Sequence, residues 1–219
     1  MPFFDPIPEP DAEQIRDRPT CHDYPGHLPE HWLPGLGGEG VVLARSATTA
    51  VFLRVDAVFP RGLALSLDAR LHPDDLVEGE FFGFHHDYVP AGRRLRVGLE
   101  WPDGSRVVAE ARRGPEADSA PRLSMTGGGG GGLTFSWNLW LHPLPPAGPV
   151  TVHVLWESRG IEETSVVWDL APIVARAGDA VELWPLPPPP EEYGWTAYSP
   201  MDGGSATIAA LSDDGEGES

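Results

Sequence analysis

Apolar side chains recur at every second position through much of the chain between residues 41 and 184. In residues 51–59 and 63–71 the odd positions are apolar, whereas the even positions include Arg54, Asp56 and Asp68. Successive side chains of a β-strand point to opposite faces, so a period of two is typical of a strand with one buried face. The pattern argues against a helical bundle and predicts half-buried antiparallel strands.

Turn signals separate the alternating segments. Pro60-Arg61-Gly62 and Pro102-Asp103-Gly104 each lie between two such segments, and Asp-Gly is a strong hairpin signal. The 26 glycines and 25 prolines also disfavour long helices. We therefore predict an all-β fold, an antiparallel β-sandwich of immunoglobulin-like or jelly-roll type, with irregular Pro/Gly-rich terminal arms. The strands are expected at 41–45, 51–59, 63–71, 93–101, 107–111, 133–141, 150–156, 161–170 and 181–184, with a short helical turn in 171–177.

Proline and charge divide the chain into three parts. Residues 1–38 are expected to form a Pro-rich N-terminal arm, residues 39–185 the β-sandwich domain, and residues 186–219 a Pro-rich and then acidic, largely disordered tail. The net charge of −18 is concentrated at the ends, because residues 1–40 carry −6 and residues 178–219 carry −9. Acidity of this kind indicates solvated arms rather than a charged binding face.

The composition also limits location and partners. An acidic chain without a basic patch repels nucleic-acid phosphate and anionic lipid, so we expect neither nucleic acid nor membrane as a partner. No apolar run reaches the roughly 20 residues that cross a bilayer, no secretory signal is visible, and Cys21 is the only cysteine. We expect a cytoplasmic protein. All 15 basic residues are arginine, a bias that fits a GC-rich bacterial genome.

Six consecutive glycines, residues 127–132, precede the segment 133–141. Glycine lacks a Cβ and ranges widely in φ, so the run is expected to be a mobile connector between strands. A phosphate-binding loop would precede a helix and often carries a lysine, whereas here a strand follows and the chain has no lysine. A nucleotide site is therefore not expected in the run.

Trp140 and His142 lie on the polar side of segment 133–141, and His153 lies on the polar side of segment 150–156. If these strands pair as a hairpin through residues 142–149, the three side chains form one outer patch. Such a patch would suit stacking against a sugar ring or contact with a partner. The alternative is that the N-terminal arm or the Pro-rich C-terminal segment covers Trp140 as part of the structure.

The motif FFGFHHDY at 81–88 contains side chains that can bind a divalent metal, namely His85, His86 and Asp87. Adjacent residues of a strand point to opposite faces, so both histidines would rarely reach one ion. The alternative is a loop whose phenylalanines close one end of the sandwich. No cofactor is expected elsewhere.

The segment WLHPLPPAGPVTVHVLWESRGIEET at 140–164 combines a Trp strand, a Pro-Leu-Pro-Pro turn and a Gly-Pro-led strand that ends in Trp. Together with the glycine run and Leu183-Trp184-Pro185, it resembles a group of uncharacterised actinobacterial β-sandwich proteins. The resemblance covers about half of the chain. It implies a free-standing intracellular sandwich and no particular activity.

These observations favour a non-catalytic interaction or structural module with a protein partner of unknown identity. A hydrolase elbow of the form Gly-x-Ser-x-Gly is absent, and the paired acidic residues Asp74-Asp75 and Glu162-Glu163 are expected in solvated turns. One alternative is a carbohydrate-binding or ligand-binding β-domain that uses Trp140, His142 and His153. A second is a metal-dependent enzyme centred on His85, His86 and Asp87.

Overall fold

The computed structural model describes residues 22–23, 27–75, 94–109, 121–188, 196–197 and 206–207. The chain divides into one unit that runs from Pro25 to Pro185 and another that comprises Met1–Tyr24 and Leu186–Ser219. In the second unit, two short strands pair antiparallel, β13 (Thr196–Ala197) with β14 (Ala206–Thr207). The fold described below is that of the Pro25–Pro185 unit, which includes β1 and β2 within the predicted N-terminal arm.

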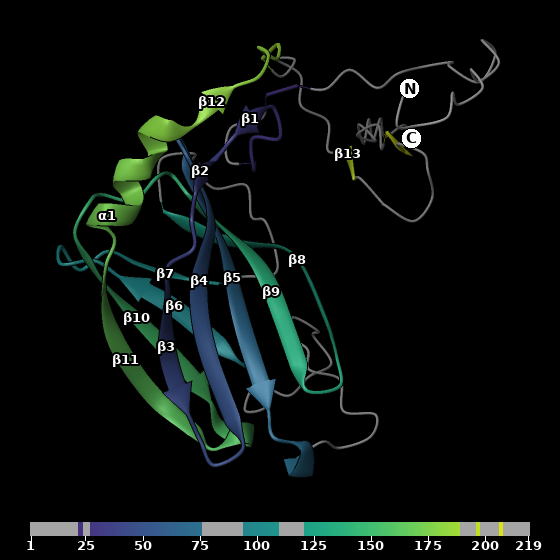
Figure 1. Cartoon of the computed structure of the whole chain (residues 1–219), viewed down its shortest axis with the longest axis vertical. Helices are drawn as coiled ribbons and strands as arrows, with labels where there is room; N and C mark the ends of the chain where they lie inside the picture. Colours follow the sequence, from purple (N-terminus) through teal and green to yellow (C-terminus); the bar gives the residue numbers. More distant parts are fainter. Residues whose placement is uncertain are drawn as a thin grey trace, which may run out of the picture. The chain divides into compact units, whose positions relative to one another are not determined.

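The unit contains two main antiparallel sheets, which lie in separate layers in Figure 1. In the first sheet, β3 pairs with β4, and the remaining strands follow the order β2-β4-β5-β9-β8. Its strands are β2 (Gly35–Leu36), β3 (Gly40–Arg45), β4 (Thr49–Phe59), β5 (Gly62–Leu71), β8 (Arg122–Gly131) and β9 (Thr134–His142).

The second sheet has the order β11-β10-β6-β7. The turn at Pro102-Asp103-Gly104 joins β6 to β7, as the sequence predicts, and Gly104 has a φ of 85° there. A side chain would be strained at that φ, which explains the glycine. The strands are β6 (Arg96–Glu100), β7 (Arg106–Val108), β10 (Pro149–Trp156) and β11 (Ile161–Asp169).

One hydrophobic core receives side chains from both sheets. Leu65 of β5 and Trp137 of β9 contribute from the first sheet, and Val97 of β6 and Val152 of β10 contribute from the second. All four are at most 7% exposed. The period-two alternation therefore predicts the buried face correctly, and the mostly β architecture of antiparallel sheets is confirmed.

The six-glycine run is not a connector, contrary to the prediction. Residues 127–131 form the second half of β8 and pair in register with β9, from Gly127 opposite Asn138 to Gly131 opposite Thr134. The turn falls at Gly132 and Leu133, where Gly132 has a φ of 60°. Backbone hydrogen bonding to β9 orders a segment that has no side chains to indicate a strand.

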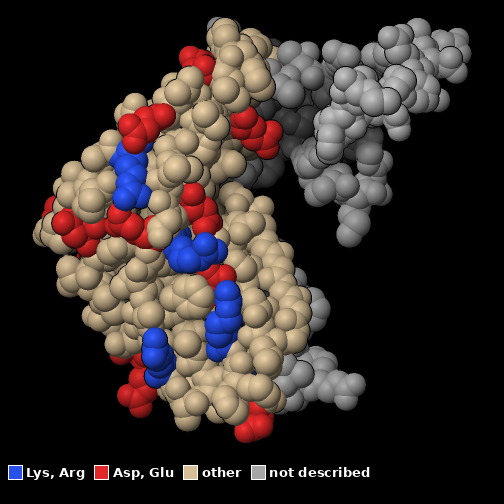
Figure 2. Space-filling view, viewed as in Figure 1, with Lys and Arg blue, Asp and Glu red and all other residues tan. Residues whose placement is uncertain are grey.

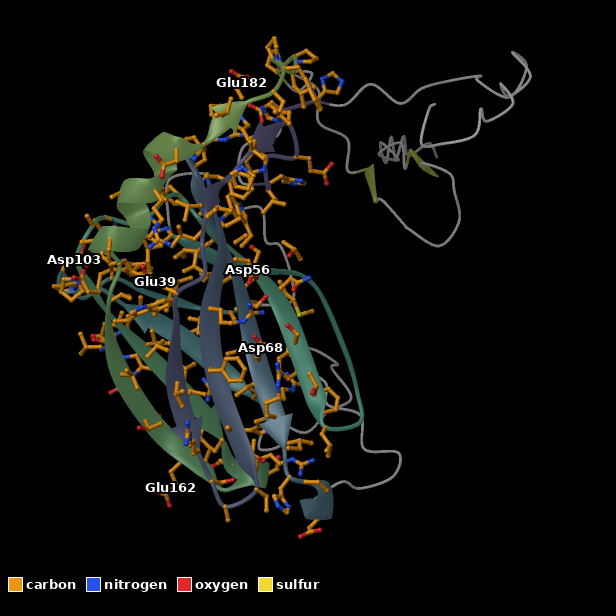
Figure 3. All side chains as sticks on the ribbon, viewed as in Figure 1. Glu39, Asp56, Asp68, Asp103, Glu162 and Glu182 are labelled. Atoms are coloured by element: carbon orange, nitrogen blue, oxygen red, sulfur yellow. The ribbon has the colours of Figure 1, made fainter. Side chains whose placement is uncertain are left out.

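The outer face of the first sheet carries a polar network. Asp68 of β5 is nearly buried and pairs with Arg54 of β4 at 2.8 Å and with Arg70 at 3.6 Å. Ser66 donates a hydrogen bond to Asp56, and Figure 3 labels Asp56 and Asp68 on these neighbouring strands. On the face shown in Figure 2, basic and acidic side chains are interspersed among a majority of uncharged residues.

After β11 the chain forms a short helix, α1 (Ala171–Val174), and a 3-10 turn, η5 (Ala175–Asp179). Ile173 of α1 is fully buried in the core. Arg176 of η5 donates to the carbonyl oxygens of Leu36 and Gly37 and pairs with Glu39 at 2.6 Å. These contacts attach the segment to the start of the first sheet.

A separate two-stranded ribbon brings the two ends of the unit together. β1 (Trp32–Leu33) pairs antiparallel with β12 (Val181–Glu182), and the amide of Leu183 donates to the carbonyl of His31.

Two further 3-10 turns are η2 (Pro73–Asp75) and η4 (Glu157–Arg159). Within the described residues, no helix has the length and apolar character required to span a bilayer.

Candidate functional site

The structure divides the predicted outer patch between two sheets. β9 pairs with β5 and β8, whereas β10 pairs with β6 and β11, so residues 142–149 cross from one sheet to the other. The hairpin on which the patch depended does not form. Trp140 and His142 remain neighbours on β9, and His153 of β10 lies in a different setting.

Trp140 and His142 are buried, with 1% and 8% of their surfaces exposed. Their rings stack with centroids 6.4 Å apart, and Phe59 meets the Trp140 ring edge-to-face at 5.6 Å. His142 Nδ1 lies 2.9 Å from the carbonyl oxygen of Arg61. Trp140 therefore presents no open ring face to solvent, and packing accounts for both side chains.

His153 lies on the outer face of the second sheet, above a row of small side chains. Its direct cross-strand partners are Gly98 of β6 and Ser165 of β11, and Gly98 in turn faces Val108 of β7. Because Gly98 has no side chain, the sheet surface is lowered beside the imidazole. The result is a hollow over β6 with His153 on one side.

Glu100 connects His153 to Arg106 across this hollow. Its Oε1 accepts a hydrogen bond from Arg106 Nη2 at 2.9 Å, and its Oε2 lies 3.1 Å from His153 Nε2. The hydrogen bond from Arg106 is the main cause that holds the pKa of Glu100 below its ordinary value of 4.5, and His153 acts in the same direction. An ionised carboxylate only accepts, so Nε2 of His153 carries the proton and donates.

The hollow is part of a groove of about 340 Å³, which we call the His153 groove. This volume lies within the range of small-molecule sites. Strands β6, β7, β10 and β11 contribute its charged and polar lining, which consists of Arg96, Glu100, Arg106, His153 and Glu163. Of these, only His153 was identified from the sequence. The others come together through the β10–β6 and β6–β7 pairings, which alternation alone does not reveal.

The predicted metal ligands His85, His86 and Asp87 lie outside the described residues. Within the described ranges, no group of three or more histidine, cysteine, aspartate or glutamate side chains is placed to hold a metal ion. The metal site therefore stays a prediction from the sequence.

The free edge of β8 is a second candidate site, and the sequence analysis missed it. In the described part of the chain, β8 ends its sheet and pairs only with β9. Residues 128–132 are exposed although β7 lies beside β8. An edge strand presents unpaired N–H and C=O groups that can bind another strand. The signal in the sequence that could have indicated this edge strand is the uninterrupted glycine run directly before an alternating segment.

Comparison with known proteins adds no relative. No family model matches the chain, and no curated protein or solved structure matches it. The fold and the two sites therefore define a mostly β protein of antiparallel sheets, and its function has to be argued from the sites themselves.

Proposed function

We propose that this chain is a non-catalytic interaction module that binds an extended segment of a partner protein along the free edge of β8. The observation that supports this proposal is the exposed glycine strand itself. Natural proteins usually protect an edge strand with charged side chains, proline or an outward bulge. The register of β8 with β9 is irregular between Met125 and Gly127, but from Thr126 to Leu133 the chain has no charged residue and no proline.

The glycines differ in what they offer on the two faces of the sheet. A Cβ at Gly129 or Gly131 would meet no atom within 4 Å, whereas a Cβ at Gly128 would lie 3.2 Å from the Trp137 ring. A partner strand beside β8 would therefore find open space on one face and the Phe135 and Trp137 side on the other. We expect the partner segment to carry bulky apolar side chains at alternate positions. Such side chains can pack over the exposed backbone of the glycines on the neighbouring strand.

A further apolar surface supports an interaction role. On the β1–β12 ribbon, Leu33 and Val181 are direct cross-strand partners and are 56% and 53% exposed. Trp184 follows with 55% exposed. Leu33 and Val181 thus form an exposed apolar pair, which supports an interaction surface on this ribbon.

The edge can be tested with a library of displayed extended peptides and the full-length chain. Gly129→Lys places a charge on the open face without a steric clash, and Gly178→Lys makes the same change where a Cβ also meets no atom within 4 Å. We expect selected peptides to bind the wild type and Gly178→Lys and to lose affinity for Gly129→Lys by at least about tenfold. They should also slow amide hydrogen exchange in residues 127–131.

Recovery of peptides that bind Gly129→Lys and Gly178→Lys equally would contradict the edge as the binding site. Failure of the library to yield any alternating apolar peptide would contradict the proposed partner class.

The remaining sequence expectations stay proposals. Two antiparallel sheets around one core support a β-sandwich, of immunoglobulin-like or jelly-roll type. A cytoplasmic location, a likeness to the actinobacterial group and the absence of nucleic-acid or membrane partners are proposed on the sequence alone. The ligand-binding alternative now rests on His153, because the groove around it has the volume of a ligand site.

A further inference from the structure

The His153 groove contains more hydrogen-bond donors than acceptors that remain available. Glu100 and Arg96 face it from β6, Arg106 from β7, His153 from β10 and Glu163 from β11. Both oxygens of Glu100 are already engaged, one by Arg106 and the other by His153. Among the lining carboxylates, only Glu163 at the β11 side is left without a contact to a described residue.

Among the lining residues, Arg96 has the largest number of N–H donors that are not used by a described residue. It lies directly opposite Leu155 across the β10–β6 pair, and its guanidinium makes no hydrogen bond or ion pair with the described residues. Arg106 uses one terminal nitrogen for Glu100 and keeps its other N–H groups. A guanidinium presents donors in a planar fork that fits a carboxylate with two parallel bonds.

Part of the groove lining is apolar. Gly98 leaves the centre low, Val108 lies directly opposite it on β7 and is 47% exposed, and Leu155 lies opposite Arg96 on β10 and is half-buried. A flat hydrocarbon body can lie over Gly98 between Val108 and the His153 ring and reach Leu155 beside Arg96, where these contacts remove apolar surface from water.

We propose that the His153 groove binds a small organic carboxylate, with its charged group on Arg96 beside Leu155 and its apolar body over Gly98 between Val108 and His153. This proposal names the ligand class for the ligand-binding alternative. Its residues differ from those of the β8 edge, because the groove is lined by β6, β7, β10 and β11 of the other sheet, although β7 lies beside β8.

The test uses the full-length chain and three probes of similar shape: benzoate, benzyl alcohol and benzylamine. The readout is the ring C–H signals of His153 in NMR spectra, assigned by comparison with His153→Gln. Benzoate should shift these signals with a millimolar dissociation constant, and benzyl alcohol and benzylamine should not.

Two matched variants locate the charged contact. Arg96→Gln should weaken benzoate binding by at least about tenfold, since a charge-assisted pair of hydrogen bonds is lost. Arg45→Gln removes the same charge from an exposed site on β3 outside the groove and should leave binding unchanged. Gly129→Lys should also leave it unchanged, which separates this result from partner binding at β8.

The proposal is overturned if benzoate leaves the His153 signals in place, or if benzyl alcohol or benzylamine shifts them equally. It is also overturned if Arg96→Gln and Arg45→Gln bind benzoate alike. Thermal unfolding of each variant checks its folding, and the comparison of probes on the wild type decides the matter should Arg96→Gln fail to fold.

Discussion

Gly130 faces the ring of Phe135 across the β8–β9 pair so closely that a Cβ at position 130 would lie 2.5 Å from ring atom Cδ1. One residue earlier, a Cβ at Gly129 would meet no atom within 4 Å. The glycine run thus alternates between positions where a side chain would clash, such as Gly130, and positions where a side chain would fit, such as Gly129.

This alternation predicts opposite effects of the same substitution. Gly130→Ala should lower the free energy of unfolding by about 1–3 kcal/mol, because the methyl group would clash with the Phe135 ring and with the backbone carbonyl oxygen of Thr134. Gly129→Ala should raise it by up to about 1 kcal/mol, because alanine restricts the unfolded chain. Guanidinium unfolding curves measure both. Equal effects at the two positions would contradict the register of β8.

The polar network of the first sheet gives a second prediction. Asp68→Asn should lower the free energy of unfolding by about 1–3 kcal/mol, because it removes the charged partner of Arg54 and Arg70 from a nearly buried position. Asp74→Asn serves as the control, since the Asp74 side chain is 87% exposed, and should change stability by less than about 0.5 kcal/mol. Urea unfolding of both variants checks the difference.

A third prediction concerns acid. The pKa of Glu100 is lower in the folded protein than its ordinary 4.5, so its contribution to stability is present above that value and is lost as the pH falls through the folded pKa. The stability difference between the wild type and Glu100→Gln should therefore be greatest near neutral pH and should shrink below about pH 4. Unfolding curves across this range measure it. A difference that grows on acidification would refute the ion contacts with Arg106 and His153.

Trp140 gives a fourth prediction. Its indole nitrogen is buried and makes no hydrogen bond in the described structure, so Trp140 contributes to stability mainly through the volume that its ring fills. Trp140→Ala should cost about 3–5 kcal/mol, whereas Trp140→Phe should cost about 1–2 kcal/mol because a ring still fills the space beside Phe59. Thermal unfolding monitored by circular dichroism distinguishes the two. An equally large loss for phenylalanine would indicate a hydrogen bond of the indole nitrogen.

Alternation in the sequence predicts most strands of the fold, because a strand with one buried face requires an apolar side chain at every second position. Leu53 and Leu67 illustrate this: each was assigned to the apolar side of its strand, and they face each other in the register of β4 with β5. The Pro60-Arg61-Gly62 turn between these strands was also predicted correctly. Both features depend only on neighbouring segments.

What the sequence does not record is pairing between distant segments and burial on the outer face. Glycine has no side chain, so residues 127–131 of β8 show no alternation, and the sequence predicts a connector there. Trp140 is predicted on the polar face of its strand, but it is buried and meets Phe59, which is distant in the sequence. The His153 groove likewise needs the β10–β6 pairing, which joins residues about 50 positions apart.

The pairing of β1 with β12 has a consequence for engineering. It holds positions 32–33 beside positions 181–182, so the chain enters and leaves the Pro25–Pro185 unit at one place. A unit with adjacent entry and exit points can be inserted whole into a surface loop of a host protein, or its ends can be fused and reopened elsewhere. Residues 25–185 are therefore a suitable unit for insertion into another protein and for circular permutation.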